Sequence, residues 1–424
     1  MSSIYKNILL LTSASILSRL IGILSIPIIT RLYSPSDMGV LSAFISITSV
    51  LLAFSTLRYS VVIPLPRTQG YALNASVLCL IVLSFVCTLL FILIYFFYEV
   101  FFDFFNLNAL IEYWYFLPIS LLLFGLVEIL NTWAIRYKKF KLISSANVFQ
   151  SSIGATSKII FGLVNLNPIG LIIGQVLVQA GSVIMLLKFY FSKYSSKKVS
   201  IKRILYIARY YSDIPKFRLP SQVLLALCVN MPILFFSYHF GTEITGQIGL
   251  ALTVLSLPVS MIAQTIGQAF YGEVANIGRK KPRLIQELSK DIFKKLLIIS
   301  LVPFTVLVIF GEDIFKIAFG AKWSDAGLYA RIMSLYIVTN LVSSPLVNIL
   351  NIYARNSLYL WINLSRFLLL IGIFSLSFCF EYSIVNTLLI YSLLLSVHYM
   401  FITLLIFKVL DFEVIKFDGN VNVQ

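Results

Sequence analysis

The stretch Lys188–Arg218, KFYFSKYSSKKVSIKRILYIARYYSDIPKFR, divides this sequence of 424 residues into two apolar halves. It contains nine Lys or Arg residues and a single acid, Asp213. Within it, Ile201, Ile204 and Leu205 share one face of a predicted helix, while the basic residues lie elsewhere around it. This pattern suits a helix that lies on an anionic membrane surface. A solvated basic linker between membrane spans is the alternative interpretation.

The composition indicates a polytopic membrane protein with the lipid bilayer as its first partner. Hydrophobic residues make up 59% of the chain and charged residues 12%, whereas soluble domains carry about 25% charged residues. The net charge of +16 comes from basic residues between apolar spans, which argues against nucleic acid as a partner. The four Cys and two His residues lack metal-ligand spacing, so we expect no metal and no other cofactor.

Twelve apolar windows are long enough to cross the hydrocarbon core of a bilayer, which takes about 20 helical residues each. They cover approximately residues 8–29, 39–63, 73–97, 114–135, 143–163, 168–190, 219–238, 245–270, 292–311, 327–350, 358–379 and 384–408. The predicted fold is therefore all-α and integral to the membrane. Six windows on each side of the basic stretch predict an N-terminal lobe over 1–191, a cytoplasmic linker over 192–218 and a C-terminal lobe over 219–424.

The loops between these windows differ in charge. Numbered alternately from the N-terminus, one set of loops holds most of the Lys and Arg residues, and the other holds mostly Asp and Glu. Because basic residues are retained on the cytoplasmic side, this asymmetry predicts that both termini are cytoplasmic.

The two halves also carry a weak internal repeat. Two short patterns correspond: Ile26-Pro27-Ile28 with Tyr33 and Gly39, and Met231-Pro232-Ile233 with Tyr238 and Gly246. Halves of six spans each would insert in the same orientation. Parallel repeats about an axis along the membrane normal are a transporter layout, with the substrate path between them.

Five ionisable residues stand out within the predicted spans: Arg19, Arg58, Glu128, Lys158 and Arg366. Each would cost about 2.5 to 3.5 kcal/mol at the bilayer centre, so most must face a wet cavity, a partner or an interface. Four of the five are cationic, which suits an anionic headgroup such as a diphosphate. We therefore predict that the four cations bind substrate.

Arg19 and Lys158 are the leading candidates because each lies on a polar helical face. Ser15 is one turn from Arg19, and Ser151 is two turns from Lys158. For Arg19, the alternative is a contact that only packs helices together. For Lys158, the alternative is that its long side chain reaches the outer surface.

Arg366, Arg58 and Glu128 complete the candidate set. Arg366 is predicted beside Asn363 in the eleventh span, where a packing role is the alternative. Arg58 lies within two turns of the cytoplasmic end of its span, so it could instead extend to the headgroups. Glu128 could carry a proton through a transport cycle, or it could pair with one of the buried cations.

Several motifs resemble those of the Wzx-type oligosaccharide flippases, a family in the MOP superfamily together with the MATE exporters and lipid II flippases. The N-terminal motifs are Ser18-Arg19-Leu20-Ile21-Gly22, Tyr33-Ser34-Pro35-Ser36-Asp37-Met38-Gly39, Arg58-Tyr59 and Pro64-Leu65-Pro66. The later motifs are Leu257-Pro258, the run Gln264–Phe270, and Phe319-Gly320-Ala321-Lys322-Trp323-Ser324-Asp325-Ala326-Gly327.

The resemblance implies a two-lobed fold of twelve helices in the bacterial inner membrane. It also implies that the chain moves undecaprenyl-diphosphate-linked repeat units to the periplasmic leaflet by alternating access. Such units supply O-antigen, and hence lipopolysaccharide, or capsule. The polymerase and chain-length proteins of the same pathway are the implied protein partners.

Other classes of function predict different features. A MATE-like, cation-coupled multidrug exporter would share the fold but would be expected to hold cationic drugs with buried carboxylates, whereas the five residues that stand out here are one acid and four cations. An ATP-driven pump would need a GxxxxGK[ST] loop, which the sequence does not contain. A membrane enzyme would need a substantial outer loop with a nucleophile or base, and a scaffold protein would tolerate loss of every buried cation. We therefore expect a transporter and not an enzyme.

Overall fold

The structure is a computed structural model that describes residues 3–105, 107–194, 198–279, 281–353 and 355–421. Side chains are described from Ile16 onward, except at 109, 112, 258–265, 268–269, 275, 351, 356 and 419–421. Ser15, which was predicted beside Arg19, and Gln264 of the resemblance motifs therefore lie outside the described side chains. Helices account for nearly all of the described residues, and none of these residues forms a strand. This confirms the all-α fold class.

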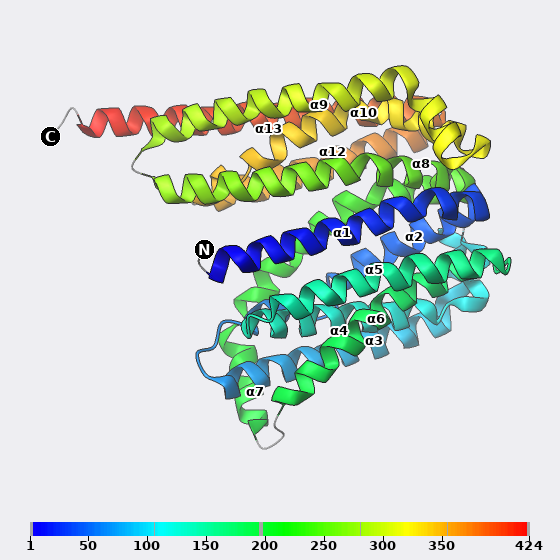
Figure 1. Cartoon of the computed structure of the whole chain (residues 1–424), viewed down its shortest axis with the longest axis horizontal. Helices are drawn as coiled ribbons and strands as arrows, with labels where there is room; N and C mark the ends of the chain where they lie inside the picture. The colour runs from blue at the N-terminus through cyan, green and yellow to red at the C-terminus, as the bar shows by residue number, and fades with distance from the viewer. Residues whose placement is uncertain (1–2, 106, 195–197, 280, 354, 422–424) are drawn as a thin grey trace. The chain divides into compact units, whose positions relative to one another are not determined.

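Figure 1 shows the helices in chain order. The first seven are α1 (Ser3–Leu32), α2 (Pro35–Leu52), α3 (Gln69–Phe104), α4 (Phe116–Arg136), α5 (Phe140–Leu163), α6 (Ile169–Lys193) and α7 (Ile201–Tyr210). The others are α8 (Leu219–Ile277), α9 (Pro282–Phe319), α10 (Ser324–Leu346), α11 (Ile349–Ile352), α12 (Asn356–Cys379) and α13 (Ile384–Val421). Short helical turns lie between them: η1 (Tyr59–Val62), η2 (Asn108–Tyr113), η4 (Ile214–Arg218) and η5 (Ala321–Trp323).

The chain is a multi-pass membrane protein. Eight helical stretches among the described residues are long and apolar enough to cross a bilayer: α2, α3, α4, α6, the stretch Ile214–Leu257, α9, Ser357–Cys379 of α12 and Ile384–Asp418 of α13. The other predicted spans are also helical. They correspond to α1, α5, α10 and the later part of α8.

The chain forms two compact units, Met1–Gly246 and Gln247–Gln424. Helix α8 contributes to both, and its backbone leaves helical geometry at Gly241, where φ is 83°. Only glycine adopts this conformation without steric cost. The lobes predicted over 1–191 and 219–424, with their linker, stay a prediction, and so does the cytoplasmic location of the termini.

The turn between α1 and α2 follows directly from the sequence Ser34-Pro35-Ser36-Asp37. The Ser34 hydroxyl accepts a hydrogen bond from the Asp37 amide at 3.2 Å, and the Asp37 carboxylate accepts one from the Ser34 amide at 2.8 Å. Pro35 occupies the first helical position. These features form a capping box that starts α2 and fixes the reversal of the chain.

One core cluster of the first unit lies between α3, α4, α6 and α7. Trp133 and Leu83 are almost fully buried there, and α7 adds Ile204 and Ile207 to the same cluster. Leu205 is 52% exposed. The predicted helix in the basic stretch is thus present, but its apolar face is divided between this core and the surface.

In the second unit, α10 packs against both α9 and α13 (Figure 1). Gln247 connects α8 to the start of α10, because its amide donates to the Lys322 carbonyl at 2.7 Å and accepts from the Ala326 amide at 3.0 Å. Gly327 of α10 lies so close to α9 that a Cβ atom would come within 2.6 Å of the Gly311 carbonyl oxygen. The helix pair α9–α10 therefore depends on small residues at its closest approach.

Within Met1–Gly246, the two glycines of the internal repeat face each other. A Cβ atom on Gly39 would lie 1.8 Å from the Thr242 carbonyl oxygen, and one on Gly246 would lie 1.8 Å from the Pro35 carbonyl oxygen. Both distances are far shorter than a van der Waals contact. The backbones of α2 and α8 can approach this closely only because both positions lack a side chain.

We expect Gly39→Val to destabilise the protein by roughly 1–3 kcal/mol, because the added atoms must displace the α8 backbone. Thermal unfolding in detergent would measure the effect. Gly22→Val is the matched control, since a Cβ atom on Gly22 has no neighbour within 4 Å. Equal stability of the two variants would contradict the close contact.

Candidate functional site

Four of the five predicted site residues lie in the first unit, and Arg366 lies in the second. Within the first unit they occupy α1 (Arg19), the segment after α2 (Arg58), α4 (Glu128) and α5 (Lys158). The structure brings Arg58 and Glu128 together and gives Lys158 a different partner.

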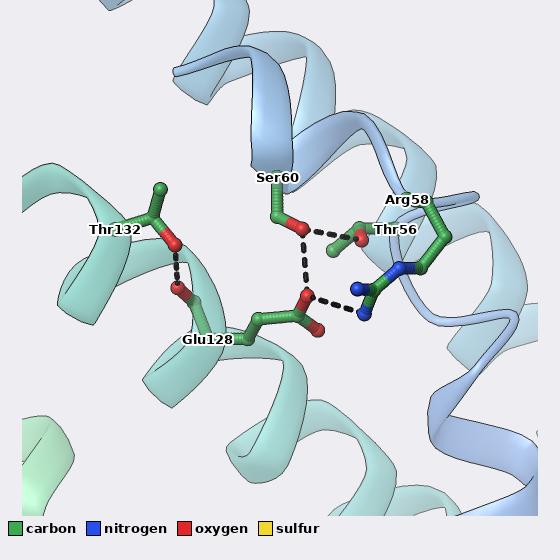
Figure 2. A network of polar contacts seen from close by, with 5 residues as sticks. All are labelled: Thr56, Arg58, Ser60, Glu128 and Thr132. Carbon is green, nitrogen blue, oxygen red and sulfur yellow. Dashed lines mark hydrogen bonds and ion pairs between the residues drawn. The ribbon is translucent and has the colours of Figure 1, made fainter. Parts of the chain in front are cut away.

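Arg58 and Glu128 form an ion pair between the α2–η1 connection and α4 (Figure 2). The Arg58 Nη1 atom lies 3.2 Å from Glu128 Oε1, and the Ser60 hydroxyl donates to the same oxygen at 2.6 Å. The two charged side chains are 27% and 24% exposed. Glu128 was expected either to pair with a cation or to carry a proton. The structure shows the pair with Arg58, and the role as a proton carrier stays a prediction.

The backbone before η1 explains how Arg58 reaches α4. Leu57 and Arg58 both have positive φ, 45° and 62°, which is uncommon for residues with a side chain. These two residues reverse the chain after α2, and Tyr59 then holds the turn by donating to the Ala208 carbonyl at 3.0 Å. Residues in such a conformation cost of order 1–3 kcal/mol each and persist only where surrounding contacts hold them. The Glu128 contacts provide part of that support.

Lys158 points toward α6. Its ammonium donates to the Gln175 side-chain oxygen at 2.8 Å, so the alternative of reaching the outer surface is not what the structure shows. Gly174 makes this possible, because a Cβ atom there would lie 2.5 Å from Lys158 Cγ. The Tyr33 hydroxyl donates to the Lys158 carbonyl at 2.9 Å and places this residue beside the end of α1. Gln175 is neutral, and no carboxylate in the described part of the chain lies within ion-pair distance of Lys158, so its charge is hydrogen-bonded but has no counter-charge there.

Arg19 and Lys158 lie at different positions along the axis of α1. Arg19 is partly exposed on α1 and precedes Tyr33 by about 14 residues, or roughly 21 Å along a helix. Since Tyr33 contacts Lys158, the two cations are separated along the helix axis by a distance of that order.

Arg366 of α12 lies against the Tyr399 ring of α13, with its guanidinium carbon 5.0 Å from the ring centroid. Among the described residues, no carboxylate lies within ion-pair distance of it. No group of three or more His, Cys, Asp or Glu side chains in the described part of the chain could hold a metal ion.

Ser60 and Gln175 were not predicted as site residues, although Ser60 contacts Glu128 and Gln175 contacts Lys158. Each is a polar residue within or beside an apolar span, and this was the only signal available. Their partners are 68 and 17 positions away in the chain, so only the folded arrangement identifies them.

The family model described as polysaccharide biosynthesis protein matches residues 28–328. A comparison with curated proteins gave no match.

The structure resembles several solved transporters of the MOP superfamily. An inward-facing multidrug resistance MATE family transporter matches with a TM-score of 0.72 at 13% identity, over 95% of this chain and 96% of that chain. The lipid II flippase MurJ, in an inward closed conformation, matches at 0.69 and 15%, over 98% and 93%. A MOP superfamily transporter from Pyrococcus furiosus, described as having a binding pocket of reverse polarity, matches at 0.62 and 13%, over 97% and 96%. At these identities the likeness shows the fold, and it confirms the predicted MATE-like and MOP-like architecture.

A double-mutant cycle of Arg58→Met and Glu128→Gln should give a coupling energy of roughly 1–3 kcal/mol, because each single change leaves a charged partner in a half-buried site. Chemical or thermal unfolding in detergent would provide the four stabilities. Arg331 and Glu312 form the control pair, since they are about half exposed and their charged atoms lie 3.9 Å apart. We expect less than about 1 kcal/mol there. A coupling energy near zero for Arg58 and Glu128 would show that the ion pair does not form.

Proposed function

Because the chain belongs to the family of polysaccharide biosynthesis proteins, we propose that it is a flippase for undecaprenyl-diphosphate-linked oligosaccharides. It moves the repeat unit from the cytoplasmic to the periplasmic leaflet of the bacterial inner membrane, for O-antigen or capsule assembly. The MOP-type fold supports a transport function, since MATE transporters and a lipid II flippase share it.

The observation that carries this proposal is the balance of charge within the spans. Glu128 is compensated by Arg58, whereas Lys158 is held by a neutral amide and keeps its charge uncompensated. A cationic drug would meet repulsion at Lys158 and would find the carboxylate already paired. A diphosphate, in contrast, gains charge-assisted hydrogen bonds from ammonium and guanidinium groups.

Arg19, Lys158 and Arg58 then act on the diphosphate at different depths of the first unit. In this proposal, Glu128 takes up a proton, the ion pair opens, and the Arg58 guanidinium becomes available to the headgroup. Loss of the proton restores the pair and releases the headgroup. The ion pair thus couples proton movement to cargo binding, because each state of Glu128 changes the affinity for the anion.

In this proposal the prenyl tail stays in lipid while the headgroup and sugars move. With both termini in the cytoplasm, the basic stretch around α7 faces the leaflet in which the cargo is made. The polymerase and chain-length proteins of the pathway consume the product on the other side.

Transport by purified protein in liposomes tests the proposal. The cargo is a fluorescent undecaprenyl-diphosphate oligosaccharide, and an external quencher reports its arrival in the outer leaflet. We expect Lys158→Met to reduce the rate by about tenfold or more, because a lost charge-assisted hydrogen bond is worth roughly 1.5–3 kcal/mol. Arg19→Ala should reduce it in the same direction, and Lys158→Arg should retain most of it.

Arg283→Ala is the matched control, since Arg283 is a largely exposed cation at the start of α9. Its rate should equal that of the wild type. If the wild type moves no such lipid but expels a cationic dye under an imposed ion gradient, a MATE-like multidrug exporter is the correct function. A rate that is unchanged in all cation variants would instead indicate a scaffold role.

A further inference from the structure

An apolar cavity of about 270 Å³ lies in the second unit, among α9, α10 and α13. Each of these three helices packs against the other two (Figure 1). The floor of the cavity is well buried, since Val342 is 4% exposed and Thr403 is 7% exposed. The rim is formed by Leu297, Met400 and Leu404, which are 37%, 58% and 61% exposed. The cavity therefore opens on the surface of the unit.

The lining residues, all of which the structure describes, offer no free polar group. The two hydroxyls among them donate to carbonyls of their own helices, Thr339 to Tyr336 at 2.9 Å and Thr403 to Tyr399 at 3.0 Å. A sugar or a charged drug would lose its hydrogen bonds to water on entering and would gain none. The cavity suits hydrocarbon. Since an apolar cavity of about 150 Å³ binds benzene, this one holds roughly ten carbons of a chain.

The cavity lies near one end of the helix pair α9–α13. The two helices run in opposite directions, because the Phe293 and Phe407 rings pack with their centroids 5.8 Å apart and Arg283 Nη2 lies 2.8 Å from Asp418 Oδ2. Residues that precede Phe293 on α9 and residues that follow Phe407 on α13 therefore lie at the same end of the cavity.

Two exposed lysines, Lys290 of α9 and Lys408 of α13, lie at this end. Lys290 precedes Leu297 by seven residues and Lys408 follows Leu404 by four, and both spacings keep two residues on one face of a helix. The lysines are thus roughly 10 Å and 6 Å from the rim, measured along their helices. In the part of the chain that the structure describes, neither has a carboxylate within ion-pair distance.

The charge at this end of the cavity is positive on balance. Lys294 adds a third exposed cation. Outside the ion pairs, the acids in the same turns of the two helices are Glu287 and Asp411. Asp411 already accepts a hydrogen bond from the Gln286 side chain. An anionic group is therefore favoured beside the lysines.

We propose that the cavity and the two lysines form a binding site for an anionic phospholipid of the surrounding bilayer, such as phosphatidylglycerol. One acyl chain enters the cavity, and the phosphate lies between Lys290 and Lys408, which donate charge-assisted hydrogen bonds to it. The second chain remains in the bilayer. The bound lipid fills the gap between three helices, so the stability of the second unit depends on the lipid composition of the membrane.

These residues favour a resident phospholipid over the lipid-linked cargo. A transported headgroup leaves the membrane surface and needs binding groups at several depths, whereas the lysines lie together beside the first turns of α9. A resident phospholipid keeps its phosphate at one depth, where lysine side chains at the ends of spanning helices reach the headgroups. The site is therefore independent of the cargo proposed for the protein.

Titration of the delipidated full chain with lipid in detergent tests the site without a transport assay. Dioleoyl phosphatidylglycerol and dioleoyl phosphatidylcholine carry the same chains and differ in the charge of the headgroup. Native mass spectrometry counts the bound lipids, and thermal unfolding measures stabilisation, since a ligand that binds the folded state stabilises it. We expect phosphatidylglycerol to bind at least about fivefold more tightly and to raise the unfolding temperature in a saturable manner.

Lys290→Gln combined with Lys408→Gln should lower the affinity for phosphatidylglycerol by about tenfold, because each lysine near the membrane surface attracts anionic lipid. The affinity for phosphatidylcholine should not change. Lys281→Gln combined with Lys416→Gln is the matched control, since it removes the same charge from the same helix pair farther from the cavity.

Val338→Phe should weaken the binding of both lipids by at least about fivefold, because the added ring atoms occupy the cavity and displace part of the acyl chain. Leu335→Phe is the control on the same helix. Leu335 is partly exposed one turn earlier on α10 and does not line the cavity, so binding should equal that of the wild type. The lysine variants, which change exposed residues, decide the matter if Val338→Phe does not fold.

Equal affinity of the wild type for the two lipids, or an equal loss in the lysine variant and its control, would overturn the proposal. Tighter binding of undecaprenyl phosphate than of phosphatidylglycerol, lost in Val338→Phe, would also overturn it and would assign the cavity to the prenyl tail of the cargo. A failed transport assay leaves this titration unaffected, so the two proposals can fail separately.

Discussion

Hydrocarbon offers no hydrogen-bond partners, so each polar group inside this helical protein must be satisfied within its own helix or by a neighbouring one. Many serine and threonine hydroxyls donate to the carbonyl one turn earlier, as Thr48 does to Phe44 and Ser289 does to Ile285. Charged groups cannot be satisfied in this way. They require partners from other segments, and the positions of those partners decide which helices must approach one another.

Close approach in turn depends on residues with little or no side chain. Gly39 and Gly246 allow α2 and α8 to meet backbone to backbone, and Gly174 allows α6 to lie against the stem of Lys158. The hydrogen bond between Lys158 and Gln175 is thus a consequence of the glycine that precedes the glutamine. Small residues and ionisable residues act together, because the small residues let two helices come close enough for an ionisable side chain on one to hydrogen bond to the other.

Three of the partly buried cations are held in three different ways, and each suits a different task. Arg58 is neutralised by Glu128 and becomes available only when that pair opens. Lys158 is hydrogen-bonded to a neutral amide and keeps its charge. Arg366 is held by an aromatic ring and lacks a counter-charge among the described residues. A set of cations with graded availability can attract an anionic lipid and respond to protons.

The sequence alone determined that this is an all-α membrane protein, because span length and apolar composition depend only on local residues. The MOP-like fold was indicated by the resemblance of its motifs to a known family. It also identified the five ionisable residues of the candidate site, since charges in apolar windows stand out without knowledge of the fold. Tertiary structure decided the pairing of Arg58 with Glu128, the contact of Lys158 with Gln175 and the packing of Arg366 against the Tyr399 ring. These contacts join residues far apart in the chain, and helix packing, which depends on shape at every contact, determines which of them meet.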